Sequence, residues 1–454
     1  MFSRNTVLIS IGIFVAVVFS TPSAFAQTIW IVAPGTGGDF STIQDCINAA
    51  VNGDTCQVNP GTYYENVTFL NKEITLRSSS GAQTTIIDGQ GDPELPVVRI
   101  NGGQQEAVLD GFTIRNGDSR QGDPGYPGGI FIYESNPTIT DCTIRDCYGY
   151  GGGGIGCYYA SPEIKGCTLF SNYGGPGGGG GGIRCEDGNP TISGCVIYSN
   201  GTDELGGGIM LNRSDAEITN CVLSGNGGWM AIGGGIFCGD SYPTITNCIL
   251  VDNFAEWAGG IYLADSNPTI TNSTIANNDG GFGGGGIYLD GYSYPTITNT
   301  ILWGNIGRDG PQIYVRSGMP TVTYSDVEGG WTGTGNISTN PLFVGGGDYH
   351  IQGSSPCIDT GSNSALALPS KDIDGQGRKL DGDCDDYAVA DMGADEYRNN
   401  SCNGTFWPSD NAAAASVVGA TIETTRISAV FNNLVFLLFP VGAILFLSIR
   451  RCRR

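Results

Sequence analysis

The sequence predicts an all-β solenoid made of stacked coils, and three observations lead to this fold class. The triplet Gly-Gly-Ile returns about every 26 residues along the middle of the chain. Each repeat contains short apolar stretches that alternate with polar residues, the pattern of a β-strand with one buried face. Glycine occupies 74 of 454 positions, often in clusters, so turns rather than helices separate the strands.

Each repeat has the same internal order. An apolar pair is followed by a turn that usually contains proline, a T-I-T strand, and a C-x-I strand that ends shortly before an asparagine. A unit of this size cannot bury its apolar face alone, so we expect one coil per repeat, with the asparagines satisfying turn amides and carbonyls along the stack. The isoleucines of the triplets, including a degenerate last copy, are Ile130, Ile155, Ile183, Ile209, Ile236, Ile261, Ile287 and Ile313.

The two ends of the chain predict export and anchoring. Residues 1–26 have the form of a signal peptide, because an early arginine precedes an apolar stretch and an Ala-Phe-Ala cleavage site. Residues 429–454 combine an uncharged apolar run with a tail of arginines, which predicts one C-terminal transmembrane helix with its basic end in the cytoplasm. A buried core helix is the alternative there. We therefore expect a bacterial cell-surface protein, or one on the outer face of a membrane, with a single-pass anchor.

Charge and composition exclude several classes of function. The formal net charge is -23, which would repel a nucleic-acid backbone, so no nucleic-acid partner is expected. The chain has one histidine, His350, so a multi-histidine metal site is excluded and any histidine-dependent nucleophile would rest on that residue. The expected partners are a surface glycan or protein, and the membrane through the C-terminal helix.

The repeats also carry a family resemblance over about residues 29–324. The patterns I-x-N-C-x-I-x-x-N and GG[G]I resemble the right-handed parallel β-helix repeats of the pectin-lyase-like superfamily, and the repeats of polymorphic outer-membrane proteins. The stretches G-D-F-S-T-I-Q at 38–44 and P-G-T-Y-Y-E-N-V at 60–67 are similar to the opening of pectinesterase-like β-helices. This resemblance implies a right-handed parallel β-helix whose N-terminal end is capped by a short helix at about residues 41–51.

The segment after the repeats resembles a choice-of-anchor Q domain. The matching motifs are N-P-L-F at 340–343, G-D-Y-H-I at 347–351, D-I-D-G at 372–375, and D-M-G-A-D-E-Y at 391–397. The resemblance implies a C-terminal cap on the solenoid. The expected division of the mature chain is residues 27–127 for the N-terminal cap and first coils, 128–335 for the repeats, 336–398 for the C-terminal cap, and 399–428 for a linker to the membrane segment.

Fifteen cysteines in an exported chain raise the question of disulfides. Cys46 and Cys56 form the most promising pair, and Cys357, Cys384 and Cys402 are candidates for another. Most of the others fall into columns of the repeat, where in-register parallel strands favour packed thiols over disulfide geometry. The two columns are Cys142, Cys167, Cys195, Cys221 and Cys248, and Cys157, Cys185 and Cys238.

An acidic run near the C-terminus suggests a calcium loop. Asp381, Asp383 and Asp385 have the spacing of the first ligands of an EF-hand. However, Asp386 stands where that loop needs glycine, and Met392 stands where it needs a bidentate glutamate. A solvated acidic loop is therefore the preferred interpretation, and Ca²⁺ is the only cofactor that the sequence suggests.

The residue after each Gly-Gly-Ile is expected to face outward. In the later repeats this position holds Phe237, Tyr262, Tyr288 and Tyr314, all candidate binding residues, and the three successive tyrosines would form a flat aromatic strip for stacking on sugar rings. The alternative is that these aromatics raise strand propensity and stack on one another.

No catalytic residue is predicted. Asp290 and Arg316 are expected to be outward neighbours on successive coils, where a surface salt bridge is the simpler interpretation. The motifs that carry the two aspartates, the arginine and the glutamines of pectinesterases are not found after Val67. The sequence thus predicts a non-catalytic surface β-helix for adhesion or glycan contact. The alternative is a carbohydrate-active enzyme, a polysaccharide lyase or pectinesterase-like esterase.

Overall fold

The computed structural model describes residues 27–399, apart from 91–93, 104–105 and 124. The expected signal peptide, nearly all of the linker and the expected membrane segment lie outside the described residues. Within the described ranges, no helix is both long enough and apolar enough to cross a membrane.

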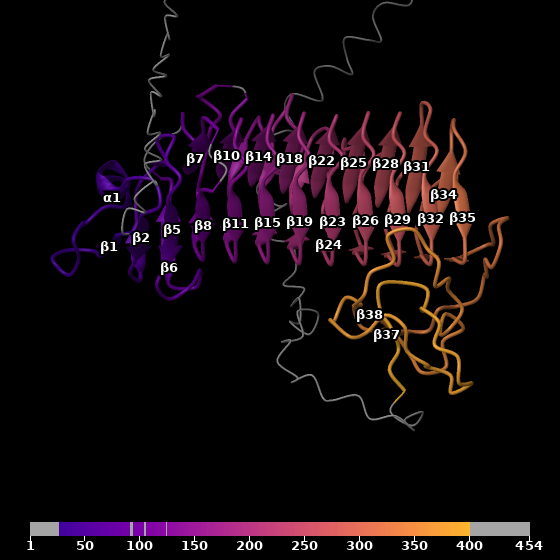
Figure 1. Ribbon diagram of the computed structural model, residues 1–454. Helices are drawn as coiled ribbons and strands as arrows, with labels where there is room; N and C mark the ends of the chain where they lie inside the picture. Colours follow the sequence, from indigo (N-terminus) through magenta and orange to yellow (C-terminus); the bar gives the residue numbers. More distant parts are fainter. Residues whose placement is uncertain (1–26, 91–93, 104–105, 124, 400–454) are drawn as a thin grey trace, which may run out of the picture. The chain divides into compact units, whose positions relative to one another are not determined.

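The described chain is an all-β parallel β-solenoid of about 11 turns (Figure 1). Each full turn adds one strand to each of three parallel sheets. Sheet A collects the T-I-T strands, sheet B the C-x-I strands and sheet C the strands that follow Gly-Gly. The chain divides into an N-terminal unit, Met1–Glu217 with Gly225–Asp240, and a C-terminal unit, Ile218–Ser224 with Ser241–Arg454.

The N-terminal unit contains one helix and the earlier strands of each sheet. Its helix is α1 (Ile43–Ala49). Sheet A holds β1 (Ile29–Val32), β2 (Thr55–Val58), β5 (Thr75–Ser78), β8 (Val108–Asp110), β11 (Thr138–Thr140), β15 (Glu163–Lys165) and β19 (Thr191–Ser193). Sheet B holds β3 (Gly61–Tyr63), β6 (Thr85–Asp88), β9 (Thr113–Arg115), β12 (Thr143–Arg145), β16 (Thr168–Phe170) and β20 (Val196–Tyr198). Sheet C holds β4 (Val67–Thr68), β7 (Val98–Asn101), β10 (Ile130–Tyr133), β14 (Ile155–Tyr158), β18 (Ile183–Glu186), β22 (Ile209–Asn212) and β25 (Ile236–Gly239), and a small sheet holds β13 (Tyr148–Gly149), β17 (Tyr173–Gly174) and β21 (Gly201–Thr202).

The C-terminal unit contains the later strands and a hairpin. Sheet A holds β26 (Thr244–Thr246), β29 (Thr269–Thr271), β32 (Thr296–Thr298) and β35 (Thr321–Thr323), while β23 (Glu217–Thr219) contains a boundary between the units. Sheet B holds β24 (Val222–Ser224), β27 (Ile249–Val251), β30 (Thr274–Ala276), β33 (Ile301–Trp303) and β36 (Asp326–Val327). Sheet C holds β28 (Ile261–Ala264), β31 (Ile287–Asp290) and β34 (Ile313–Val315), and the antiparallel hairpin is β37 (Phe343–Gly345) with β38 (Asp348–Ile351).

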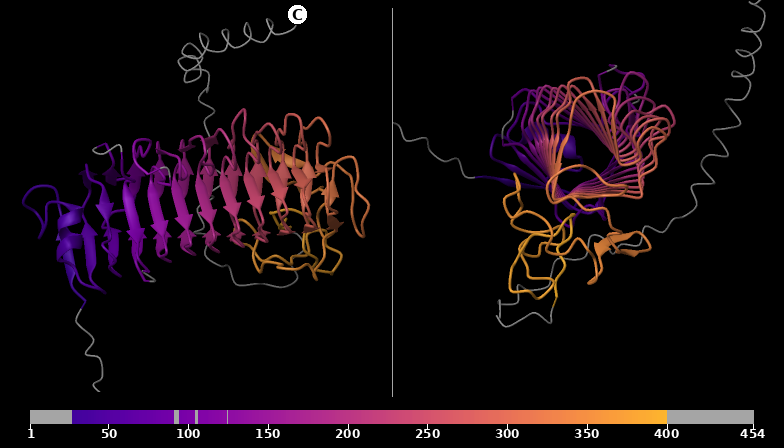
Figure 2. Two further views of the ribbon diagram at one scale, coloured as in Figure 1. Left: turned by 90° about the horizontal axis from the view of Figure 1, so that it is seen from above. Right: turned by 90° about the vertical axis from the view of Figure 1, so that its right-hand side faces the viewer.

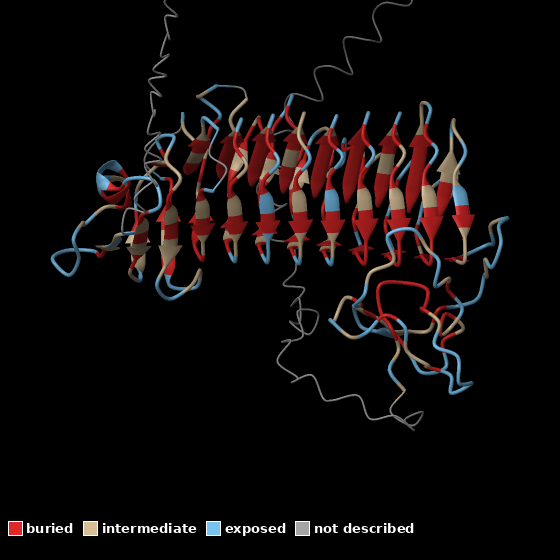
Figure 3. Cartoon of the chain, in the orientation of Figure 1, coloured by how far each residue is buried: buried red, intermediate tan, exposed pale blue. Residues whose placement is uncertain are grey.

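Equivalent residues of successive repeats lie directly over one another within each unit. Ile130 pairs with Ile155, which pairs with Ile183. Their side chains are buried, as the alternation predicts, and the strands of the stack are largely coloured as buried in Figure 3. At the corner between sheets A and B the chain bends through a left-handed residue, such as Asp141 or Gly166, types that adopt positive φ readily.

Buried asparagines form hydrogen-bonded columns along the stack. In the N-terminal unit the side-chain amide of Asn172 donates to Oδ1 of Asn200 at 2.9 Å, and Asn200 donates to Asn226 at 3.0 Å. In the C-terminal unit Asn253 donates to Asn278 in the same way, at 3.0 Å. Each of these amides also donates to a backbone carbonyl of the preceding coil, for example Asn200 to Leu169 at 3.0 Å. The repeated asparagine thus satisfies turn groups inside the coil.

Helix α1 lies against the first coil. Thr42 caps it by accepting from the Asp45 amide, and the Glu65 carboxylate accepts from the amides of Ile43 and Gln44 at 2.8 and 3.0 Å. The helix contacts β1, β2 and β4. A disulfide joins Cys46 of the helix to Cys56 of β2. The helix is shorter than the range of about 41–51 expected from the sequence, and its role as a cap stays a prediction.

The cysteines of the two repeat columns are buried thiols. Sγ of Cys142, Cys167 and Cys195 each lies 3.6 to 3.7 Å from a backbone carbonyl oxygen of the preceding coil. Cys357 is also a buried free thiol, whereas Cys384 is disulfide-bonded. Cys357, Cys384 and Cys402 were the candidates for a second disulfide. Cys357 therefore takes no part in one.

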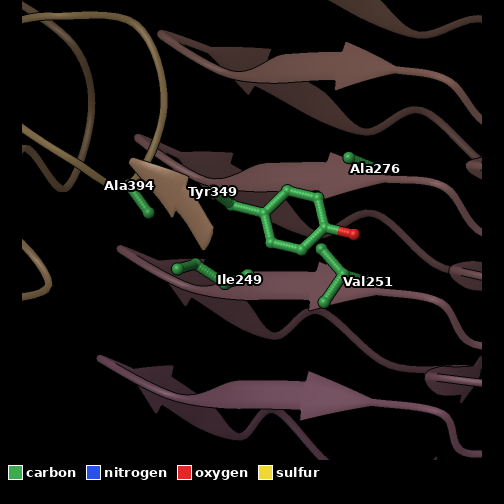
Figure 4. Packing of buried hydrophobic residues seen from close by; sticks show 5 residues of the cluster. All are labelled: Ile249, Val251, Ala276, Tyr349 and Ala394. Atoms are coloured by element: carbon green, nitrogen blue, oxygen red, sulfur yellow. The ribbon is translucent and has the colours of Figure 1, made fainter. Parts of the chain in front are cut away.

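Residues 336–398 pack against the outward face of sheet B in the C-terminal unit (Figure 2). Ile249, Val251 and Ala276 point outward there, yet they are buried under Tyr349 and Ala394 (Figure 4). The equivalent outward residues of β12 and β16 in the N-terminal unit remain half-exposed. The segment expected to cap the solenoid therefore covers the side of these coils, and the apolar residues at outward positions of β27 and β30 are the sequence signal for this contact.

One buried arginine connects this segment to the solenoid. The guanidinium of Arg378 donates to the carbonyl oxygens of Ala394 at 2.6 Å and Asp395 at 3.0 Å, and it contacts the side chain of Asn247 in the corner after β26. It also lies 3.5 Å from the Glu396 carboxylate, and both side chains are almost fully buried. Arg378 therefore satisfies backbone groups of the 393–396 segment while holding that segment on the corner of a coil.

Replacing Arg378 should destabilise this contact. We expect Arg378→Met to lower the free energy of unfolding by about 3–5 kcal/mol, because it leaves buried carbonyls without their donor and removes the cation beside buried Glu396. Chemical denaturation followed by circular dichroism would measure this. Arg213→Met is the matched control, because Arg213 pairs with Asp187 on an exposed surface, and it should change stability little. Equal effects of the two substitutions would contradict the role assigned to Arg378.

Asp326 should make stability depend on pH. Burial raises the pKa of Asp326 to about 6, against hydrogen bonds from the Thr339 amide and the Cys357 thiol. Because the folded pKa exceeds the unfolded value, its stabilising contribution is complete below about pH 4 and is lost as pH rises through 6. We compare the free energy of unfolding of Asp326→Asn with that of the natural protein. The difference should shift in favour of the variant by about 2–3 kcal/mol as pH rises from 4 to 7. A stability difference that is constant over that range, measured by denaturant titration at each pH, would refute this.

Candidate functional site

The candidate site is an aromatic column on the outward face of sheet C in the C-terminal unit. Tyr262 on β28, Tyr288 on β31 and Tyr314 on β34 are register partners on successive strands. The ring centroids of Tyr262 and Tyr288 are 4.8 Å apart with an interplanar angle of 11°, and those of Tyr288 and Tyr314 are 4.9 Å apart at 48°. The rings stack because parallel strands repeat at about 4.8 Å.

The central ring of this column does not reach solvent, contrary to the expected flat strip. Tyr288 is only 2% exposed. The indole of Trp257 meets it edge-on, with centroids 5.9 Å apart. A Cβ atom at Gly283 would lie 2.8 Å from Cδ2 of Tyr288, so the glycine-rich turn before β31 runs directly over the ring. Phe237, on β25 of the N-terminal unit, is also buried, at 8% exposure.

The aromatic residues that do reach solvent form a different set, which we call the aromatic ledge. Phe282 is 52% exposed and lies with its ring centroid 6.4 Å from that of Trp257, which is half-buried. Tyr262 and Tyr314 are half-exposed on either side of Tyr288. The aromatic ledge is Trp257, Tyr262, Phe282 and Tyr314.

Sequence reasoning missed Trp257 and Phe282. Both lie in glycine-rich turns before a strand, where no strand periodicity indicates the direction of a side chain. The only signal for Phe282 was a large aromatic residue among glycines, and the turn that holds Trp257 lacks even this, because it also contains Phe254 and Glu256.

An ion pair borders the ledge. Oδ2 of Asp290 accepts a hydrogen bond from the hydroxyl of Tyr262 at 3.0 Å and from Nη1 of Arg316 at 2.9 Å. The salt bridge considered from the sequence is therefore present. Burial opposes ionisation, but the hydrogen bonds from the Gly291 amide and Tyr262 and the charge of Arg316 hold the pKa of Asp290 below its ordinary value. Asp290 is a carboxylate at neutral pH and offers its oxygens as acceptors, not as a general acid.

The acidic loop expected as a weak calcium candidate lies elsewhere in the C-terminal unit. Ligand atoms of Asp381 and Asp383 lie within 4.8 Å of one another and of Asp359. The Asp381 carboxylate accepts from the amides of Asp385 and Asp386 at 3.1 Å each. The Asp385 carboxylate accepts from the Tyr387 amide at 2.9 Å. These carboxylates thus hold their own loop, the arrangement of a solvated acidic turn.

Comparisons with known proteins identify the fold. Residues 97–265 match the family described as "Right handed beta helix region". Among solved structures, pectate lyase Pel9A is similar with a TM-score of 0.54 and 15% identity, over 82% of this chain and 97% of that one. A rhamnogalacturonan lyase has a TM-score of 0.49 and 16% identity over 70% and 91% of the two chains, and a pectin methylesterase from carrot has 0.39 and 14% over 66% and 89%. No curated protein matches the chain. The family match and the likeness to pectate lyase Pel9A support a right-handed parallel β-solenoid fold.

The burial of Tyr288 leads to a direct test. We expect Tyr288→Ala to lower the free energy of unfolding by about 3–5 kcal/mol, because it removes a ring packed between Tyr262, Tyr314 and Trp257. Phe282→Ala, at the exposed end of the ledge, should cost about 0.5 kcal/mol or less. Thermal or urea unfolding of both variants would measure the difference. A loss at position 288 as small as that at position 282 would show that the tyrosine faces solvent.

Proposed function

We propose that this protein is a non-catalytic, cell-surface β-helix that binds a neutral glycan on the aromatic ledge. The observation that carries the proposal is the grouping of Trp257, Tyr262, Phe282 and Tyr314 beside the Asp290–Arg316 ion pair. Ligand sites commonly combine aromatic surfaces with a few fixed polar groups. Here the rings offer faces for the C–H surfaces of sugars, and the ion pair offers an acceptor and a donor for sugar hydroxyls.

The charge of the chain supports an uncharged ligand. A net charge of -23 disfavours polyanionic glycans such as polygalacturonate. Near the ledge, Arg316 is already paired with Asp290, so this cation is not available to neutralise a uronate without breaking that contact. The proposed ligand is therefore a glycan chain without carboxylates.

The alternative is a polysaccharide lyase or pectinesterase-like enzyme. The fold resembles that of pectate lyase Pel9A, and the name of that protein makes polysaccharides the first ligand class to test. General acid–base catalysis requires a group whose pKa lies near the working pH. The low pKa of Asp290 and its four hydrogen-bond donors favour a binding role for the polar part of the ledge.

Several features support an exported, anchored protein. The disulfide between Cys46 and Cys56 suits an oxidising compartment. The sequences of residues 1–26 and 429–454 favour export and a C-terminal anchor. The resemblance of residues 336–398 to a choice-of-anchor Q domain, and of the repeats to polymorphic outer-membrane proteins, agrees with display at a bacterial surface.

A glycan array tests the function. The purified full chain should bind neutral oligosaccharides and ignore polygalacturonate. Trp257→Ala and Phe282→Ala should each weaken the binding about tenfold or more, because each removes a stacking surface. Tyr387→Ala is the control, since Tyr387 is 71% exposed and belongs to the segment after the repeats, outside the aromatic ledge, and it should bind like the natural protein.

Two outcomes would overturn the proposal. Release of reducing ends or methanol from a bound polysaccharide would make the protein an enzyme. Glycan binding that survives both ledge substitutions would place the site elsewhere.

A further inference from the structure

The C-terminal segment brings one histidine and two aspartates together from three separate places. His350 lies on β38, Asp374 in the turn that begins at Asp372, and Asp395 in the 391–397 segment. Each offers one ligand atom, and these atoms lie within 4.8 Å of one another. Nε2 of His350 is 2.9 Å from Oδ2 of Asp374.

Groups outside this set hold each donor in place. Nδ1 of His350 contacts the Asp348 carboxylate, which also accepts from the His350 amide at 3.0 Å. A carboxylate on the second ring nitrogen is the arrangement that orients histidine ligands in metal sites. Asp395 accepts from the Ile351 amide at 2.9 Å. Asp372 accepts from the Asp374 amide at 3.1 Å and fixes the turn.

The cluster is partly buried and still open to solvent. The side chains of His350 and Asp374 are 21% and 30% exposed, whereas Asp395 as a residue is 6% exposed. An ion can therefore enter from the His350–Asp374 side and keep water on its remaining coordination positions. The chain contains no other histidine, so this is the one place where it can offer a mixed set of imidazole and carboxylate ligands.

We propose that His350, Asp374 and Asp395 bind one divalent transition-metal ion, Zn²⁺ or Mn²⁺, with Asp348 as the residue that positions His350. An imidazole nitrogen with two carboxylates and water suits these ions. Ca²⁺ prefers six to eight oxygen ligands and gains little from a nitrogen donor. The acidic loop at Asp381 and Asp383 differs, because it offers oxygen donors alone.

The bound ion would link three segments of the region that covers sheet B. Asp374 follows His350 by 24 residues, and Asp395 follows Asp374 by 21. Tyr349 and Ile351, on either side of His350, are both buried in the contacts with the solenoid. Metal binding would therefore stabilise the packing of this segment on the coils. This role is independent of the aromatic ledge.

Calorimetric titration of the chelator-treated, untagged full chain with ZnSO₄ and with MnCl₂ tests the site. We expect one equivalent of Zn²⁺ or Mn²⁺ to bind and to raise the melting temperature. His350→Gln and Asp374→Asn should each abolish binding. Asp348→Asn should weaken it about 10- to 100-fold, as expected for a positioning residue. Asp383→Asn is the matched control in the acidic loop and should bind like the natural protein.

A spectroscopic readout keeps the test independent of how the variants fold. With Co²⁺ in the natural protein, the single histidine should give hyperfine-shifted imidazole signals in the proton NMR spectrum. The proposal is overturned if neither Zn²⁺ nor Mn²⁺ binds, if Ca²⁺ alone binds, if a folded His350→Gln variant binds as tightly, or if Co²⁺ leaves the imidazole signals unshifted. Those results would leave a protonated His350 bridging the carboxylates of Asp348 and Asp374 without an ion.

Discussion

The in-register stacking of one coil on the next is the constraint on which the rest of this structure depends. Because neighbouring strands are about 4.8 Å apart, each side chain meets the residue at the same position in the next coil. The sequence therefore repeats residues that pack well against their own copies. Isoleucines fill the interior, asparagines bond to asparagines, and buried thiols lie under backbone carbonyls. The same rule stacks Tyr262 on Tyr288.

Exposure on the outside depends on what lies over the coils. On sheet C, glycine-rich turns run close to the strands and bury residues such as Tyr288, because glycine lets backbone approach a ring. On sheet B of the C-terminal unit, the segment after the repeats covers Ile249 and Val251. Tyr262 and Tyr314 remain half-exposed on sheet C of that unit and form the aromatic ledge with Trp257 and Phe282 of the adjacent turns. Which aromatic residues belong to the ledge therefore depends on the turns and segments that cover their neighbours, as well as on the repeat.

The periodic part of the structure could be predicted from the sequence, but the repeat does not encode where the covering segments lie. The repeat predicted the strands, their register and the inward columns, since each copy repeats the same local pattern. The burial of Tyr288 depends on where Trp257 and Gly283 place a turn, and nothing periodic encodes that turn. Likewise, the lateral packing of residues 336–398 depends on contacts over more than 100 residues, such as Arg378 with Asn247. Within the candidate site, the tyrosine column and the Asp290–Arg316 pair were predictable, whereas Trp257 and Phe282 were not.

A distance measurement within the N-terminal unit tests the stacking most directly. Arg77 and Ser193 are far apart in sequence but are connected through Asp110, Thr140 and Lys165 by four register steps. Spin labels on Arg77→Cys and Ser193→Cys, measured by pulsed electron paramagnetic resonance, should give a narrow distribution at four strand spacings, roughly 19 Å, plus the reach of the labels. A broad distribution, or a mean distance more than about twice that spacing, would contradict the stacked solenoid.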